Sequence, residues 1–247
     1  MLKGLDLFQE HLGQLNDCFV IIGGAACSMN LGEKNLPFRQ TDDLDIVIQI
    51  EAIDKRFYHA FRDFLLKGKY RNLKSSGEKI HYRFDLPLPE YPEIIELFSR
   101  KPDKVESGLG KEITFIPIPE ETSNLSAILM DDEYYELVVN GWKIIDGLPV
   151  LSAEYLMPLK AHAYRNLVRD KKDGKKVDSI DIKKHKNDIF RLSQLLSADQ
   201  RVDLSVSVAS ELDKCLNEIT PFDPKTIGVN DTFENVISGL RSNYKII

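Results

Sequence analysis

Two aspartates separated by one residue are the clearest chemical feature of the chain. Asp43 and Asp45 open the apolar stretch Ile46-Val47-Ile48, whose β-branched residues favour a strand. Alternate side chains of a strand share a face, so both carboxylates would point the same way and repel each other. Mg²⁺ is typically held by one or two carboxylates together with substrate phosphates. The pair therefore predicts a site for Mg²⁺ or Mn²⁺, and the alternative is an acidic strand end that faces water.

A glycine pair lies upstream of these acids. Gly23 and Gly24 follow the apolar stretch Cys18–Ile22 and precede a helical pattern. The start of a helix binds phosphate through its backbone amides, here those of Ala25 and Ala26. No Gly-Lys-Ser/Thr of a P-loop and no G-x-G-x-x-G pattern is present. We interpret the pair as a seat for nucleotide phosphates, with a plain strand-to-helix turn as the alternative.

A third carboxylate is expected from a neighbouring strand. Glu96 lies inside the apolar stretch 94–98, where burying an acid is costly unless it is paired. Asp85 is the competing candidate, and either residue has a simpler interpretation as a charge at a strand edge. Arg39 and Thr41 precede the acidic strand and would contact a phosphate or cap that strand. The predicted metal ligands are Asp43, Asp45 and Glu96.

The elements that must position these side chains alternate between helix and strand in the first 150 residues. Strands are expected over 18–22, 43–50, 80–86, 94–98 and 114–118, with a hairpin over 136–146. The hairpin is placed by its central Asn140-Gly141, a strong turn signal. Helical periodicity then dominates, over 153–168 and 182–196. We therefore predict an α/β domain over 1–150 and a helical domain over 151–247.

Composition narrows the class of protein. The chain has 247 residues, a net charge of −6 and a pI near 5.5, which argue against bulk non-specific binding of nucleic acid. Its three cysteines leave one unpaired in any disulfide scheme and contain no CxxC pair, which suits a reducing cytosol. No signal peptide and no membrane-length apolar run is seen. We expect a cytoplasmic protein without membrane contact.

The charge is nevertheless uneven. Residues 160–191 carry 11 Lys/Arg against 5 Asp/Glu, a local charge of +6. Most of these lysines suit a solvated loop. Lys160 differs, because it lies between Leu156 and Ala163 on a periodic helix. Its ammonium could stabilise a leaving pyrophosphate as a point charge, and the alternative is an ordinary solvent-facing lysine.

These residues resemble a known family. Gly23-Gly24, a helix and an Asp-x-Asp strand are similar to the signature of the nucleotidyltransferase superfamily, the fold shared with DNA polymerase β. The run Arg39-x-Thr41-x-Asp43-Leu44-Asp45 and the later Leu159-Lys160-Ala161-x-x-x-Arg165 and Lys186-Asn187-Asp188-Ile189 resemble its AbiEii/AbiGii-type toxin branch. The resemblance covers 18–50 well and 150–195 moderately.

The resemblance implies a minimal nucleotidyltransferase fold with a small mixed sheet, followed by a helical domain that completes the active-site cleft. It implies that Asp43, Asp45, Lys160 and Asp188 are catalytic, with Lys160 and Asp188 facing the two acids across that cleft. Gly23, Gly24, Ala25 and Lys160 would bind the NTP. Asp188 has three readings: it orients Lys160, contacts the base or acceptor, or is an exposed helix acid.

Three functions remain open at this stage. The first is a Mg²⁺-dependent nucleotidyltransferase acting on RNA, tRNA or a protein side chain, as the toxin of a type IV toxin–antitoxin or phage-defence pair with an antitoxin encoded nearby. The basic segment would then receive the RNA. The second is a small-molecule, antibiotic-type nucleotidyltransferase, which an acidic acceptor cleft would favour. The third is a non-catalytic module of the same fold, which the intact acids and Lys160 argue against. The sequence does not name the NTP.

Overall fold

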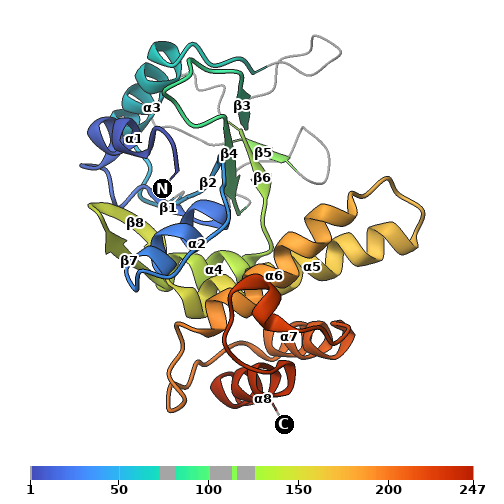
Figure 1. Cartoon of the computed structure of the whole chain (residues 1–247). Coiled ribbons are helices and arrows are strands. Elements are labelled where there is room, and N and C mark those ends of the chain that lie inside the picture. Colours follow the sequence, from blue (N-terminus) through green and yellow to red (C-terminus); the bar gives the residue numbers. More distant parts are fainter. Residues whose placement is uncertain (1, 50, 73–81, 101–112, 116–125, 247) are drawn as a thin grey trace. The chain divides into compact units, whose positions relative to one another are not determined.

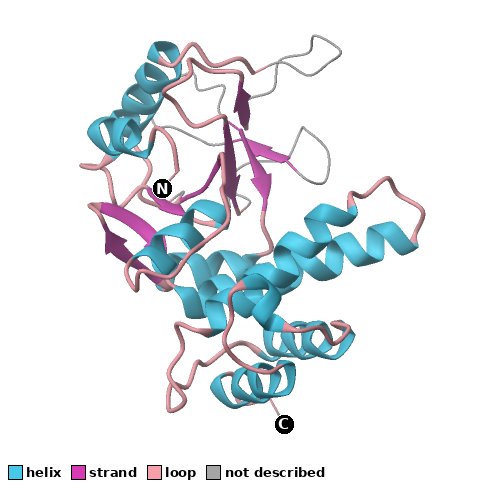
Figure 2. Ribbon diagram, in the orientation of Figure 1, coloured by secondary structure: helices cyan, strands magenta, loops and turns pink. Residues whose placement is uncertain are grey.

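The chain divides into two compact units. The computed structural model describes residues 2–49, 51–72, 82–100, 113–115 and 126–246 (Figure 1). The first unit comprises Met1–Met29 and Arg39–Leu151, and the second comprises Asn30–Phe38 and Ser152–Ile247. The first contains a mixed sheet with helices, and the second is helical (Figure 2). The predicted fold class, a small mixed sheet with helices followed by helical structure, is confirmed. The sequence did not mark residues 30–38 as part of the helical unit.

The sheet of the first unit is built from short strands. They are β1 (Phe19–Ile21), β2 (Asp43–Ile48), β3 (Arg83–Asp85), β4 (Ile94–Ser99), β5 (Ile113–Phe115), β6 (Ser126–Leu129), β7 (Trp142–Ile145) and β8 (Leu148–Leu151). Their order is β5-β6-β4-β2-β1-β8-β7, and β3 pairs with β4 beside this path. β2 and β4 are parallel, whereas β3 is antiparallel to β4. The predicted strand residues 50, 80–81 and 116–118 lie outside the described part of the chain.

One face of the sheet carries the core of the first unit. Register pairs Ile21 with Ile46 and Ile46 with Leu97, so these side chains share a face, and all are fully buried. The first unit also holds α1 (Leu5–Leu12) and α3 (Lys55–Lys67). Phe8 of α1 and Phe64 of α3 meet edge to face, with ring centroids 5.4 Å apart. Figure 1 shows the two helices together on one side of the strands.

Alternation places a different set of side chains on the opposite face. Val47 is fully buried there, but Asp43 is exposed, and Asp45 and Glu96 are half-buried. β2 thus begins with charge on this face and ends with apolar packing, while its other face is apolar throughout. The face that carries the acids is therefore set by the period of two that the sequence shows.

The predicted hairpin around Asn140-Gly141 is wrong. Residues Asp132–Asn140 form helix α4, which Asp131 caps through its carboxylate and Gly141 ends. The hairpin lies one element later, between β7 and β8. Asp146 and Gly147 make its turn with φ of 48° and 73°, the positive values that a two-residue hairpin turn requires. The apolar spacing of Tyr134, Tyr135 and Val138, all buried, favours the helix over a strand.

The second unit is a set of packed helices. They are α5 (Ala153–Lys172), α6 (Ser179–Ser193), α7 (Val206–Glu218), the 3₁₀ turn η1 (Pro224–Ile227) and α8 (Phe233–Asn243). α5 packs against both α6 and α7. Phe190 of α6 contacts Phe222 and Phe233 at centroid distances of 4.7 and 5.5 Å. In the described ranges, no helix combines the length and apolar character needed to cross a bilayer.

Candidate active site

The two aspartates lie on one face of β2, as their spacing predicts. Asp43 starts the strand and is exposed, and Asp45 is half-buried two residues further on. The backbone carbonyl of Asp45 accepts a hydrogen bond of 2.9 Å from the amide of Ile22. This bond ties the acidic strand to the residue that precedes the glycine pair. The structure therefore brings the acids and the glycines together within the first unit.

Gly23 cannot be replaced without a local change in structure. A Cβ added to it would lie 2.0 Å from Oδ2 of Asp45, so the carboxylate packs directly against the glycine backbone. Its φ of +67° is also a left-handed value that L side chains rarely adopt. At Gly24 a Cβ would lie 2.5 Å from Oγ1 of Thr41 and 3.5 Å from a guanidinium nitrogen of Arg39. The glycine pair is thus enclosed by side chains of the strand that carries the acids and of the segment before it.

The first turn of α2 (Gly23–Gly32) presents backbone donors at this point. The amide of Ala26 donates to the carbonyl of Ile22 at 3.2 Å, so Ile22 is the residue that precedes the first helical position. Our expectation that Ala26 would donate to phosphate is therefore wrong. The amides of Gly23, Gly24 and Ala25 precede it, and such first-turn amides have no intrahelical partner. Ile22 has no side-chain acceptor to cap them.

The two candidates for a third carboxylate differ in their distance from the acidic strand. Register pairs Asp45 with Glu96 on the adjacent strand, whereas Asp85 is opposite Ile94 and lies two strands away. Glu96 is engaged in an ion pair with Arg83 of β3. Among the described residues, no group of three or more His, Cys, Asp or Glu is arranged to hold a metal ion. The role of Glu96 as a metal ligand stays a prediction.

Lys160 and Asp188 are neighbours in the second unit. The ammonium of Lys160 on α5 lies 3.1 Å from Oδ2 of Asp188 on α6, and the side chains are 6% and 0% exposed. Arg191 approaches the other oxygen, Oδ1, at 3.6 Å. Lys160 is therefore not a solvent-facing lysine, and Asp188 is not an exposed helix acid. Of the three readings of Asp188, the ion pair supports orientation of Lys160. That both residues face Asp43 and Asp45 remains a prediction.

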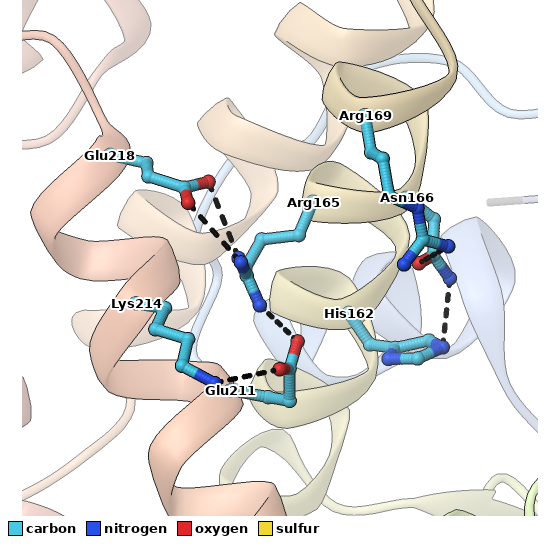
Figure 3. Close-up of polar contacts among 7 residues, drawn as sticks. All are labelled: His162, Arg165, Asn166, Arg169, Glu211, Lys214 and Glu218. Atoms are coloured by element: carbon cyan, nitrogen blue, oxygen red, sulfur yellow. Dashed lines mark hydrogen bonds and ion pairs between the residues drawn. The ribbon is translucent and has the colours of Figure 1, made fainter. Parts of the chain in front are cut away.

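Arg165 is held by a separate ion-pair cluster (Figure 3). Its guanidinium contacts the carboxylates of Glu211 and Glu218 on α7. Burial by itself would raise the pKa of Glu211, but the hydrogen bonds and charges of Arg165 and Lys214 together outweigh it and lower that pKa. Lys214 adds a further contact to Glu211 at 3.4 Å. Arg165 therefore joins α5 to α7, which is a structural task.

The cysteines take no part in this arrangement. Cys18, Cys27 and Cys215 are all buried and not disulfide-bonded. Burial raises the pKa of the Cys215 thiol to about 12, and that of Cys18 also to about 12 with a further contribution from the carboxylate of Asp17. Thiols with such pKa values carry almost no thiolate at neutral pH and are poor nucleophiles.

Comparison with known proteins gives little beyond this geometry. No protein-family model matches the chain, and no curated protein matches it. Among solved structures, the solution structure of the antibiotic-resistance factor ANT(2'')-Ia is similar to 85% of this chain and 86% of its own, with 13% sequence identity and a TM-score of 0.40. A likeness this distant has no bearing on activity.

Proposed function

We propose that this protein is a nucleotidyltransferase that moves a nucleoside monophosphate from an NTP to an acceptor and depends on Mg²⁺ or Mn²⁺. One observation carries the proposal. Asp43 and Asp45 share a face of β2, and the carboxylate of Asp45 packs against Gly23 at the first turn of α2. Carboxylates that would hold a metal and backbone amides that would bind phosphates thus lie side by side, an arrangement that suits transfer from an NTP.

The two carboxylates fit a divalent cation whose remaining ligands come from the substrate and from water. Two carboxylate side chains are the usual protein contribution to a Mg²⁺ site whose other ligands are phosphate oxygens and water. Asp43 and Asp45 would hold the ion. When bound, it would neutralise charge on the phosphates and on the attacking and leaving oxygens.

The protein's own groups would then position the nucleotide. The amides of Gly23, Gly24 and Ala25 point from the start of α2, where the helix dipole favours an anion. Lys160 would supply a cation to the leaving pyrophosphate, and its ion pair with Asp188 would fix the ammonium in one place. Such pre-organised charge, with little covalent chemistry, is the usual basis of catalysis in phosphoryl and nucleotidyl transfer.

For the acceptor we propose RNA, with tRNA or a protein side chain as variants, and for the biological role a toxin of the AbiEii type. The support is the resemblance around Asp43 and Lys160 together with the basic segment 160–191. Several of its lysines are exposed, at the end of α5, between α5 and α6, and in the first half of α6: Lys171, Lys172, Lys175, Lys176, Lys183 and Lys184. A cluster of exposed cations attracts a polyanion.

The test is transfer of label from α-³²P-labelled ATP, GTP, CTP and UTP to total tRNA in Mg²⁺. Wild-type protein is expected to label tRNA with at least one NTP, and Asp45→Asn to label none. If no NTP labels any acceptor, and none raises the melting temperature in the presence of Mg²⁺, the proposed function is wrong. Growth arrest on expression that persists in Asp45→Asn would exclude a toxin role for this site.

A small-molecule acceptor is the second candidate, and the acidic surroundings of β2 favour it. Asp42 and Glu93 are joined by a backbone hydrogen bond of 3.0 Å next to Asp43, and Asp85 lies on the same face of the sheet as Asp43. Carboxylates of this number suit an acceptor that carries several amines. A panel of aminoglycosides assayed beside tRNA separates the two: label on an aminoglycoside and none on tRNA selects the second.

A further inference from the structure

The acidic face of the sheet contains an arginine at a fixed position. Arg83 is opposite Glu96, and Glu96 is opposite Asp45, so the three side chains form one row across β3, β4 and β2. Nη1 of Arg83 donates to Oε1 of Glu96. The side chains of Arg83 and Glu96 are 39% and 23% exposed, so both remain partly accessible to solvent.

The pairing gives Glu96 a task other than holding a metal. A carboxylate bonded to a guanidinium already has its negative charge compensated, which weakens its attraction for a cation. The contact uses one of the five N–H donors of the guanidinium and sets the plane of the others. Glu96 therefore behaves as an anchor that decides where Arg83 points.

The position of the anchored guanidinium relates it to the aspartates. Neighbouring strands are about 4.8 Å apart, so β3 lies roughly 10 Å from β2, and a guanidinium held by Glu96 on the strand between them lies between one and two strand spacings from Asp45. Two metal–oxygen bonds of about 2.1 Å each and a charged hydrogen bond of about 2.8 Å together span about 7 Å, which falls within that range. An anion bound to a metal on Asp45 would thus come within reach of Arg83.

The simpler explanation of the Arg83–Glu96 contact is an ordinary surface ion pair, but this does not account for the carboxylates around it. Exposed pairs contribute little to stability and need no particular neighbours. Here the cation lies in a row with two carboxylates and on the same face as Asp43 and Asp85. Arginine also binds phosphate in a fork geometry that lysine cannot reproduce.

We propose that Arg83 contacts the triphosphate of the NTP and that Glu96 is its positioning residue rather than a metal ligand. The proposal deepens the proposed function and rests on it. It predicts a different role for each residue of the row: Asp45 binds the metal, Arg83 binds the phosphates, and Glu96 holds Arg83 in position.

The test measures binding, not turnover, on the full chain. Mn²⁺ affinity is followed by electron paramagnetic resonance without nucleotide, and calorimetry gives the Kd of non-hydrolysable NTPs and of the matching NMPs in Mg²⁺. Arg83→Gln should weaken NTP binding about 10-fold or more, the effect of losing a charged hydrogen bond. NMP and Mn²⁺ binding should change less than twofold. Arg83→Lys should give an intermediate Kd.

Two further variants make the result decisive. Glu96→Gln should weaken NTP binding by a smaller factor and leave Mn²⁺ binding as in wild type, and Arg62→Gln, an exposed arginine on α3, serves as the matched control. Wild-type NTP affinity in folded Arg83→Gln and Arg83→Lys would overturn the inference, as would loss of Mn²⁺ binding in Glu96→Gln. If wild-type protein binds no NTP, the proposed function fails and this inference with it.

Discussion

The two units treat their charged side chains in opposite ways. In the second unit, Asp188 is fully buried, yet Lys160 and Arg191 lie 3.1 and 3.6 Å from its two oxygens. In the first unit, Asp43 and Asp45 share a face, and the next carboxylate, Glu96, is one strand away. One arrangement compensates charge inside the protein, and the other gathers like charge at a partly exposed strand end.

The difference separates charge that is compensated inside one unit from carboxylates that would hold a cation. A buried pair is held because removing one partner leaves an uncompensated charge in the interior. Two carboxylates on one face of a strand repel each other, and a bound cation would relieve that repulsion. Residues that serve binding commonly cost stability in this way. Substitutions in the two places should therefore have opposite effects.

The largest effect is expected at Asp188. Asp188→Ala removes the carboxylate that compensates Lys160 and should lower the free energy of unfolding by about 3–5 kcal/mol, as measured by urea denaturation. The double variant Lys160→Met/Asp188→Leu replaces both charges with apolar groups and should recover most of this loss. A single variant as stable as wild type would show that the buried pair does not support the helical unit.

At Asp43 the effect should fall on activity alone. Asp43→Asn should reduce nucleotidyl transfer about 100-fold or more, because a metal contributes several kcal/mol to the transition state. Its melting temperature without ligand should equal or exceed that of wild type, since one repulsion is removed. Mg²⁺ with a non-hydrolysable NTP should raise the melting temperature of wild type but not of this variant. An equal rise in both would refute the metal assignment.

Gly23 lies between these extremes, because it is needed both for the backbone and for the site. Gly23→Ala should cost about 1–3 kcal/mol through its left-handed φ and displace the carboxylate of Asp45. Gly239→Ala in α8 is the matched control, since nothing lies within 4 Å of its added Cβ. That control should stabilise the protein by about 0.4–1 kcal/mol. Equal melting temperatures for the two variants would contradict the close contact at Gly23.

The smallest effect is expected at the Arg165 cluster, and it depends on pH. The folded-state pKa of Glu211 is lowered, so its contribution to stability is full above the ordinary glutamate pKa and is lost as pH falls through the folded-state value. Arg165→Gln should lower stability at pH 7 by about 0.5–1 kcal/mol and have little effect near pH 3. A loss that is larger at pH 3 than at pH 7 would show that the pair does not act through charge.

The spacing of residues along the sequence predicts the acidic strand, but it does not predict which side chains of other elements pair with each other. Asp43 and Asp45 share a face because a strand has a period of two, which a sequence shows directly. The pairing of Glu96 with Arg83 depends on which strands are neighbours, and no local pattern encodes this. The burial of Lys160 depends in the same way on Asp188, 28 residues later in the chain.

The wrong assignments have local causes. Asn140-Gly141 is a turn signal that ends a helix as readily as it joins two strands, and the buried stripe of α4 decides for the helix. Ala26 was expected to bind phosphate because the exact start of a helix cannot be read from the sequence. The hydrogen bond from Ala26 to Ile22 fixes that start and restricts the donors to the residues before it.

The inclusion of residues 30–38 in the helical unit has a consequence for dissecting the protein. The polypeptide passes between the units three times, after Met29, after Phe38 and after Leu151, so no single cut separates them. Phe38 lies under the guanidinium of Arg191, at 5.8 Å from its ring centroid. A fragment that stops at residue 151 would strip this aromatic ring of its partner. Segments of the two units thus alternate along the chain, so neither unit is one continuous stretch of sequence that could be expressed by a single truncation.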